Sequence, residues 1–239
     1  MDKTIKDITD IIKIYRENQN LYSVTIEITS FCNWRCEHCY ISEYTQKGFD
    51  EVTFRNLLIQ LREMGTFEIV FTGGEVFAHP NAMKYIKLAR EMFFNVIVYS
   101  NISMLNKQSI KTLSTLYIDY ISCTIFSMDE VIHDRITNKK GSLKKCLQNL
   151  ELLEEFGIQI EIKTPLFEQN IHSIDDVFEF CKKNNFKYKV DTQIVPRRGT
   201  VNNKVRVKSL TLKQLISIQK KIDIINGVRF IDKNENFLT

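Results

Sequence analysis

Proline, glycine and long apolar runs are all scarce in this chain of 239 residues, which holds 3 prolines and 8 glycines. No stretch approaches the roughly 20 consecutive apolar residues of a membrane-spanning helix, so we expect a soluble protein. The first residues, MDKTIKDITD, lack the basic-then-apolar order of a secretory signal, and the cytoplasm is therefore the expected compartment. In that reducing compartment, the 6 cysteines are not expected to form structural disulfides.

Acidic residues are nearly absent from one long segment of the chain. The formal net charge of +4 is too small to indicate nucleic-acid binding by itself. Between Lys182 and Lys221, however, the only acidic residue is Asp191. This segment predicts either a solvated basic surface or a groove for an acidic peptide or a phosphate-bearing ligand. Its basic residues are Lys182, Lys183, Lys187, Lys189, Arg197, Arg198, Lys204, Arg206, Lys208, Lys213, Lys220 and Lys221.

Strand-like runs alternate with amphipathic helical stretches along most of the chain. With 44% apolar residues, the chain can build the core of one large α/β domain. The alternation predicts parallel strands that are joined by crossover helices. The predicted strands are residues 23–29, 68–73, 95–101, 119–126, 158–164 and 187–195. The predicted helices are residues 52–64, 81–92, 106–116, 142–156, 173–184 and 211–225.

The amino-terminal segment carries its own helical pattern, with apolar side chains at helical spacing. We expect a helix within residues 1–21 that covers one end of the sheet, and a single domain over residues 22–239. The residues that carry this pattern are Ile5, Ile8, Ile12 and Tyr15.

Polar and apolar side chains alternate within several of the predicted strands. In the first strand, Ile26 and Ile28 alternate with Glu27 and Thr29, and the fourth, fifth and sixth strands alternate in the same way. If helices cover the apolar face, the polar face lines the inside of a curved sheet, where a closed eight-stranded barrel has apolar side chains. The pattern therefore predicts a partial (β/α)6 barrel around a wet or ligand-filled cavity. The alternative is a one-sided sheet with a solvated polar face.

Three cysteines stand close together directly after the first predicted strand. Cys32, Cys36 and Cys39 form a C-x3-C-x2-C pattern, and thiolates gathered in this way indicate a soft metal or a disulfide partner. The remaining cysteines lie on apolar faces and are expected to be small core residues. These are Cys123, Cys146 and Cys181.

Zinc and an iron–sulfur cluster are the two metal alternatives for these thiolates. His38 could complete a Cys3His zinc site, but its neighbour Cys39 would have to bind the same ion, and the chain offers no second ligand pair. A cluster of four irons suits three closely spaced thiolates better, and it leaves one iron without a protein ligand. An open coordination position indicates that a substrate or cofactor binds there.

The cysteine loop CNWRCEHC and the later element TGGE resemble the radical S-adenosylmethionine (SAM) superfamily. The resemblance extends over residues 22–210, and it implies a [4Fe–4S] cluster on Cys32, Cys36 and Cys39, with SAM on the open iron. It also implies that the cluster reduces SAM to a 5′-deoxyadenosyl radical, which abstracts hydrogen from a substrate. The implied cofactor-binding residues are Gly73, Gly74, Glu75, Ser100, Asn101, Thr124 and His38, with Thr124 in place of a serine that contacts the ribose.

Two further sets of residues follow from this resemblance. The polar interior offers candidates for fixing the cofactor carboxylate, the ribose or the substrate, although they could also form ion pairs that merely solvate the cavity. These candidates are Glu161, Lys163, Asp191 and Gln193. His133 and Asp134 also match the family, and we expect them to have a structural role at the start of a helix.

The resemblance is to SPASM and twitch-type enzymes that mature ribosomally made peptides, and it implies a peptide substrate. A separate leader-binding protein and an external electron donor such as flavodoxin or ferredoxin are the implied partners. Such enzymes continue into a cysteine-rich extension, whereas this sequence has no cysteine after Cys181. Either the sequence is truncated or the protein manages with one cluster. RNA, a small-molecule precursor, or a non-catalytic metal-bound scaffold are the alternatives.

Overall fold

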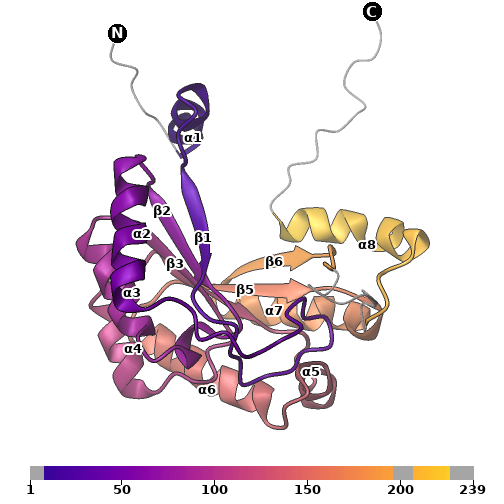
Figure 1. Ribbon diagram of the computed structural model, residues 1–239. Coiled ribbons are helices and arrows are strands. Elements are labelled where there is room, and N and C mark those ends of the chain that lie inside the picture. The colour runs from indigo at the N-terminus through magenta and orange to yellow at the C-terminus, as the bar shows by residue number, and fades with distance from the viewer. Residues whose placement is uncertain (1–7, 196–206, 227–239) are drawn as a thin grey trace, which may run out of the picture.

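The computed structural model describes residues 8–195 and 207–226, and its centre is one parallel sheet (Figure 1). The six strands are hydrogen-bonded in chain order, and each lies parallel to the next, as predicted. This order results when each crossover places the new strand beside the previous one. The strands are β1 Ser23–Glu27, β2 Glu68–Thr72, β3 Asn95–Ser100, β4 Tyr120–Thr124, β5 Ile160–Pro165 and β6 Lys187–Asp191.

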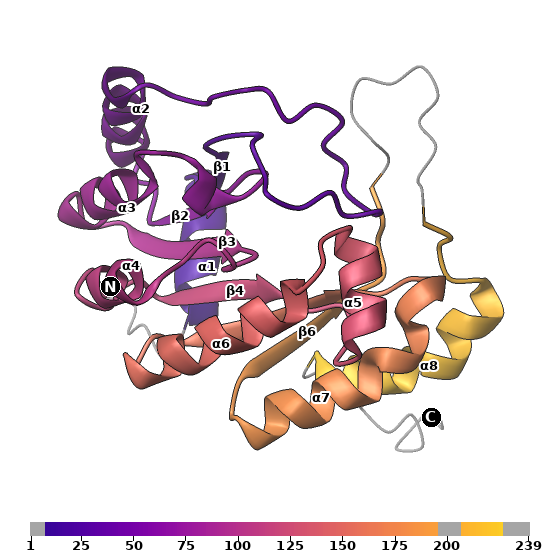
Figure 2. The ribbon, with the colours of Figure 1, turned by 90° about the horizontal axis from the view of Figure 1, so that it is seen from below.

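Helices follow the strands and cover one side of the sheet. Figure 2 shows α2, α3, α4, α6 and α7 as an arc around the strands. This arrangement is a partial (β/α)6 barrel, as the alternation of elements predicts. The helices are α1 Ile8–Glu17, α2 Glu51–Glu63, α3 Ala82–Glu91, α4 Lys107–Ser114, α5 Glu130–Thr137, α6 Ser142–Glu155, α7 Ile174–Lys183 and α8 Leu212–Ile225, with short 3-10 helices η1 Val76–Ala78 and η2 Glu168–Ser173.

The strand register confirms the predicted division into an apolar and a polar face. Ile121 of β4 stands opposite Ile160 of β5, and both are buried among the core residues. One position further along, Ser122 stands opposite Glu161, and these side chains point to the other face of the sheet. The core cysteines are also confirmed, since their exposed fractions are 0% or 1%. These are Cys123, Cys146 and Cys181.

Helix α5 was not predicted, and it explains the role of Asp134. The Asp129 side chain caps α5 by accepting a hydrogen bond from the Val131 N–H at 2.8 Å. Asp134 within α5 then caps the next helix, because its carboxylate accepts hydrogen bonds from Ser142 Oγ at 2.7 Å and the Leu143 N–H at 3.2 Å. His133 Nδ1 lies 2.9 Å from the same Ser142 hydroxyl. The predicted role at a helix start is confirmed, but the helix concerned is α6.

Helix α1 lies near the amino-terminal end of β1 (Figure 1). The Tyr15 hydroxyl donates a hydrogen bond to the Gly65 carbonyl at 2.8 Å, and its ring contacts Tyr22 edge-on. None of the described side chains of residues 9–17 is fully buried, so α1 forms the expected cover only in part. Ile5 lies outside the described residues. Among the helices that the structure describes, none has the length and apolar character needed to cross a membrane.

Candidate functional site

A long irregular loop leaves β1 and returns to the same strand end. The Ser30 N–H donates to the Gln46 carbonyl at 3.0 Å, and the Gln46 N–H donates to Ser30 Oγ at 2.8 Å. The Thr29 hydroxyl donates to the same Gln46 carbonyl at 3.0 Å. These bonds close a loop over residues 29–46, which we call the thiol loop because it carries the three clustered cysteines. The first and last residues of the loop are therefore hydrogen-bonded to each other beside the end of β1.

The middle of the thiol loop is held by the carboxyl-terminal end of α5. The Arg35 N–H donates to the Thr137 carbonyl at 3.0 Å, and the Glu37 N–H donates to the Ile136 carbonyl at 2.9 Å. These carbonyls are among the last ones of the helix, which have no partner within it. The helix that sequence patterns missed thus determines where the middle of the loop lies.

The glycine pair after β2 lies against the thiol loop. The Gly74 N–H donates to the Thr29 carbonyl at 2.8 Å, and the Glu75 N–H donates to the Phe31 carbonyl at 2.7 Å. A Cβ atom at Gly73 or Gly74 would collide with these loop carbonyls. The two glycines are therefore needed for close approach of backbone to backbone. Both also line the cavity described below, as expected for cofactor-binding residues.

Glu75 is buried behind the cavity wall, with an exposed fraction of 1%. Its carboxylate accepts hydrogen bonds from Ser100 Oγ at 2.6 Å, the Asn101 N–H at 2.7 Å and the Phe77 N–H at 3.0 Å. Burial raises the pKa of Glu75, although these hydrogen bonds oppose the shift. Both carboxylate oxygens thus hold the end of β3 against the turn after β2. The predicted contact of Glu75 with SAM stays a prediction.

Asn101 connects the end of β3 to the thiol loop. Its Nδ2 atom donates to Asn33 Oδ1 at 2.9 Å and lies 3.8 Å from the Cys32 sulfur. Its Oδ1 atom accepts hydrogen bonds from the Ser103 N–H at 3.0 Å and the Ser103 hydroxyl at 2.8 Å. The amide orientation is therefore determined by its partners, and its N–H group faces the sulfur.

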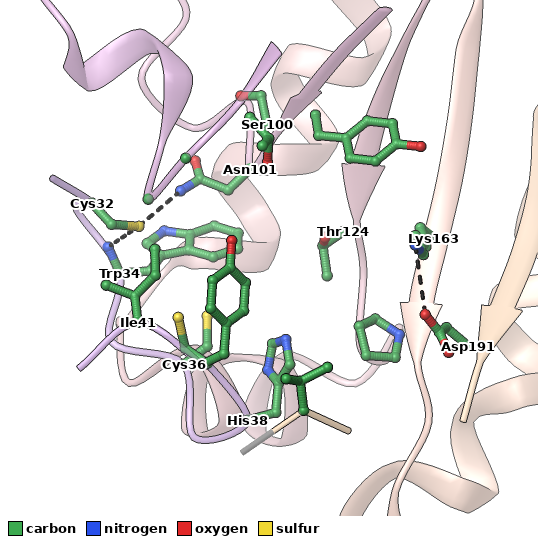
Figure 3. Close-up of a pocket in the computed structure, with 18 of the residues that line it drawn as sticks. Cys32, Trp34, Cys36, His38, Ile41, Ser100, Asn101, Thr124, Lys163 and Asp191 are labelled. Carbon is green, nitrogen blue, oxygen red and sulfur yellow. Dashed lines mark hydrogen bonds and ion pairs between the residues drawn. The ribbon is translucent and has the colours of Figure 1, made fainter. Parts of the chain in front are cut away.

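A cavity of about 320 Å³ lies between the thiol loop and the carboxyl-terminal ends of the strands (Figure 3). Barrel enzymes have their active sites at this end of the strands. The structure brings almost all of the predicted site residues to the wall of this one cavity. They are Cys32, Cys36, Cys39, His38, Gly73, Gly74, Ser100, Asn101, Thr124, Lys163, Asp191 and Gln193. Glu75 and Glu161 do not line it.

Burial favours the protonated form of two of the clustered thiols. Burial raises the pKa of Cys32 to about 11 and that of Cys36 well above the usual range of a thiol. Protonated thiols become thiolates when a metal binds, because its charge replaces the proton. The backbone N–H of Trp34 donates a hydrogen bond to the Cys32 sulfur at 3.4 Å. This chemistry fits an iron–sulfur cluster.

Unpaired polar atoms around the thiols support the same conclusion. Within the described structure, Trp34 Nε1, His38 Nδ1 and the Tyr44 hydroxyl are buried without a hydrogen-bond partner. All three side chains line the cavity. Buried polar groups are almost always hydrogen-bonded, so several unpaired ones around one cavity indicate a bound polar group.

His38 packs against two aromatic rings that also contact each other. Its ring centre lies 5.0 Å from that of Phe126 and 5.9 Å from that of Phe167, and burial lowers the pKa of His38 to about 4.

In the part of the chain that the structure describes, no His, Cys, Asp and Glu side chains form a group of three around a single metal ion. An iron–sulfur cluster does not need such convergence, since each thiolate binds a different iron.

The far wall of the cavity is built from β5 and β6. Lys163 Nζ lies 3.6 Å from the Asp191 carboxylate and 5.7 Å from the centre of the Tyr99 ring. The Gln193 N–H donates to the same carboxylate at 2.9 Å. Figure 3 shows the Lys163–Asp191 pair across the cavity from Cys32 and Cys36. Both side chains are partly exposed and can therefore contact a bound molecule.

Glu161 lies deeper in the sheet than the other predicted candidates. It accepts a hydrogen bond from Ser122 Oγ at 3.0 Å and pairs with Lys189 at 3.1 Å. The exposed fraction of Glu161 is 2%. It also lines a second, open cavity of about 450 Å³, together with Lys187 and Tyr120. The structure thus places Glu161 outside the wall of the cavity that the cysteines line.

Several cavity residues were not among the predicted site residues. Thr72, Tyr99 and Ser122 lie on β2, β3 and β4, and only Ser122 belongs to one of the strands whose alternating side chains predict a polar face. Tyr40 and Tyr44 come from the returning part of the thiol loop, where no pattern indicates which side chains turn inward. Their positions depend on contacts between distant segments.

The sequence profile of the Radical SAM superfamily matches residues 26–181 of this chain. The antilisterial bacteriocin subtilosin biosynthesis protein AlbA of Bacillus subtilis is 30% identical over 157 residues, which are 64% of this chain and 35% of AlbA. The AdoMet-dependent heme synthase of Nitratidesulfovibrio vulgaris is 22% identical over 66% of this chain and 44% of that protein. The chain thus spans less than half of either relative's length.

A solved structure has the same fold. Streptococcus suis SuiB bound to its precursor peptide SuiA matches with a TM-score of 0.71 and 14% sequence identity, over 95% of this chain and 54% of SuiB. At this identity, the likeness concerns the fold alone. It agrees with the partial barrel.

Proposed function

Since this chain belongs to the radical SAM superfamily, we propose that its barrel is the catalytic unit of an enzyme that matures a ribosomally made peptide. Enzymes of this superfamily use a [4Fe–4S] cluster and SAM. The observation that carries the proposal is a single cavity, with three thiols on one wall and an adjustable ion pair on the other. Such a cavity has room for a fixed cofactor and a substrate that approaches it.

The residues of the thiol wall would hold the cofactors. Cys32, Cys36 and Cys39 would each bind one iron, and the fourth iron would remain open for SAM. Bound there, SAM supplies a 5′-deoxyadenosyl radical that abstracts a hydrogen atom. The Gly73–Gly74 backbone would lie along the methionyl part of SAM, since no side chain stands between it and the cavity. Glu75 would keep this turn and Asn101 in place.

Residues of the strand ends would orient the rest of SAM and exclude water. Thr124 lines the cavity at the end of β4, and its hydroxyl would contact the ribose. The Phe126 and Phe167 rings, which contact His38 and each other, would form an apolar boundary. An enclosed wall protects a reactive radical from side reactions.

A peptide substrate is supported by the relatives and by the chemistry of the far wall. AlbA takes part in the biosynthesis of a bacteriocin, and SuiB binds a precursor peptide. Lys163 and Asp191 together present one positive and one negative group. Either group could bind a peptide amide or a charged side chain, since both are partly exposed.

The basic segment, residues 182–221, supports an acidic ligand less strongly than the relatives support a peptide. Three of its lysines pair with acidic residues outside the segment: Lys189 with Glu161, Lys208 with Glu168, and Lys221 with Asp175. Three of the 12 basic residues of the segment are therefore compensated within the protein. The remainder of the segment includes Arg197, Arg198, Lys204 and Arg206, which lie outside the described residues.

The test is a substrate comparison with anaerobically reconstituted protein, dithionite and SAM. We expect 5′-deoxyadenosine to accumulate faster with a candidate precursor peptide than with bulk tRNA or a porphyrin. Mass spectrometry should show the peptide with altered hydrogen content. Binding should also weaken little with salt, because few charges would be neutralised.

Two results would contradict the peptide assignment. One is modification of tRNA with a steep dependence of binding on salt, and the other is turnover with the porphyrin alone. A chain that loads zinc but neither iron nor sulfide would contradict the enzyme itself and would support a metal-bound scaffold.

We also propose the partners and the compartment. An external donor such as flavodoxin or ferredoxin would reduce the cluster, a separate protein would bind the leader of the peptide, and the reaction would take place in the cytoplasm. Replacing dithionite by reduced flavodoxin in the same assay tests the first of these partners.

A further inference from the structure

The imidazole ring of His133 lies against the thiol loop and outside the wall of the cavity. Its exposed fraction is 0%, and its Nδ1 atom lies 2.9 Å from Ser142 Oγ. That hydroxyl donates to the Asp134 carboxylate at 2.7 Å and lies 2.8 Å from the Thr137 hydroxyl. The ring is therefore fixed at the junction of α5 and α6.

The His133 ring contacts two aromatic side chains of the site. Its centre lies 5.7 Å from the Trp34 ring, edge-on at 87°, and 5.7 Å from the Phe126 ring. Trp34 stands between the first two cysteines of the thiol loop, and Phe126 contacts the ring of His38, which stands directly before the third. Aromatic pairs of this kind contribute about 0.5–1.5 kcal/mol beyond their area burial. One imidazole thus supports the loop on both sides of its middle cysteine.

Helix α5, which carries His133, also surrounds this middle cysteine in two other ways. The N–H groups of Arg35 and Glu37 donate to carbonyls at the end of α5, at 3.0 and 2.9 Å. The Cys36 side chain packs against a small cluster of buried apolar residues that includes Ile136 of α5. The position of Cys36 therefore depends on where α5 lies.

We propose that His133 is a positioning residue for the cluster site, whose ring holds Trp34 and Phe126 in place and thereby keeps the thiol loop in the shape that binds the cluster. Residues that support metal ligands from outside typically change metal affinity about 10- to 100-fold when they are replaced. This role rests on the proposed binding of iron by the three clustered thiols, and it does not depend on the substrate. Capping of α6 needs only the Asp134 carboxylate and gives no reason for an imidazole here.

Trp34 is the only tryptophan of the chain, so its fluorescence reports directly on the thiol loop. Its exposed fraction is 3%, and Figure 3 shows its indole on the same side of the cavity as Cys32 and Cys36. The signal can be measured before iron is added. A failure of the positioning role is therefore distinguishable from a failure of the iron-ligand assignment, which Cys36→Ala tests by itself.

Two substitutions separate the ring from its hydrogen bond. His133→Asn keeps a polar atom near the position of Nδ1 but removes the part of the ring that contacts Trp34 and Phe126. We expect acrylamide to quench Trp34 more strongly in this variant without metal, and the reconstituted cluster to lose iron to a chelator about tenfold faster. His133→Phe keeps an aromatic ring, loses the bond to Ser142, and should stay close to wild type in both measurements.

His79→Asn is the matched control, because His79 is a second buried histidine outside the cavity wall. Its ring centre lies 5.1 Å from that of Tyr85, and its Nδ1 atom accepts a hydrogen bond from the Asn81 N–H at 3.1 Å. His79→Asn should leave both the quenching of Trp34 and the rate of iron loss at their wild-type values. Urea denaturation of each variant ensures that only folded protein is compared.

Three results would overturn the proposal. The first is equal quenching and equal iron loss in wild type and His133→Asn. The second is a His133→Phe variant that behaves like His133→Asn, since the hydrogen bond rather than the ring would then matter. The third is the same change in His79→Asn, which would show a general effect of losing a buried imidazole.

His133→Leu keeps the test decisive if His133→Asn does not fold. His133→Leu and His133→Phe both lack the bond to Ser142 and both place an apolar side chain in the site, so they differ in the aromatic ring. We expect stronger quenching of Trp34 and faster iron loss in His133→Leu than in His133→Phe. Equal values in these two variants would overturn the proposal as well.

Discussion

The two walls of the cavity differ in how firmly their side chains are held. On the thiol wall, Asn101 is fixed by several hydrogen bonds and is 8% exposed, and Glu75, which lies directly behind this wall, is held in the same way and is 1% exposed. On the far wall, the Lys163 and Asp191 side chains are 34% and 40% exposed and are joined by one ion pair at 3.6 Å. The side chains of the thiol wall are therefore fixed before a ligand binds, whereas those of the far wall can change their positions.

This difference corresponds to the two tasks of the site. A cofactor of constant shape profits from fixed ligands, because no ordering cost arises when it binds. A substrate that must enter and leave profits from side chains which can exchange their partners. We therefore expect substitutions on the thiol wall to affect cofactor loading and folding, and substitutions on the far wall to affect turnover.

The largest effect is expected for Cys36→Ala. Loss of one of three iron ligands should reduce iron and sulfide content to background and should abolish 5′-deoxyadenosine formation. Iron and sulfide analysis after reconstitution provides the measurement. Cys181→Ala is the control, since this thiol is buried in the core away from the cavity and should leave iron binding intact. Full iron content in Cys36→Ala would disprove the ligand assignment.

An intermediate effect is expected for Glu75→Gln. The new amide would face the Asn101 N–H with a donor, so a buried hydrogen bond is lost and the free energy of unfolding should fall by about 1–3 kcal/mol. Urea denaturation measures this change. Glu51→Gln removes an exposed carboxylate that pairs with Lys84 and should cost less than about 1 kcal/mol.

The same Glu75→Gln variant separates two roles of this residue. Wild-type stability together with weaker SAM binding would show that Glu75 contacts SAM directly, and that its hydrogen bonds to the end of β3 are dispensable. A loss of stability before any cofactor is added supports the role that its hydrogen bonds indicate.

The smallest effect on stability is expected for Lys163→Met and Asp191→Asn. Half-exposed ion pairs contribute about 0–1 kcal/mol, so the free energy of unfolding should change by less than that amount. Turnover of the peptide should nevertheless fall in both variants. Urea denaturation and product formation are to be measured on the same samples. A loss of stability as large as that of Glu75→Gln would show that the two walls do not differ.

Much of the fold and most of the cavity wall could be predicted from sequence patterns. The alternation of Ile121 and Ile160 with Ser122 and Glu161 indicated both faces of the sheet, because side chains of a strand point alternately to either side. Helix α5 was not predicted, because it has only 8 residues and no long series of apolar side chains at helical spacing follows its capping residue Asp129. Its contacts with the thiol loop could not be foreseen either.

The sequence by itself determined that three thiols follow the first strand at close spacing and that six strands alternate with helices. Both features are local, and the residues that create them are neighbours in the chain. Only the tertiary structure decided that Gly73 and Gly74 meet loop carbonyls and that Asp134 caps the following helix. These contacts join segments whose approach depends on the packing of the whole barrel, so no local pattern contains them.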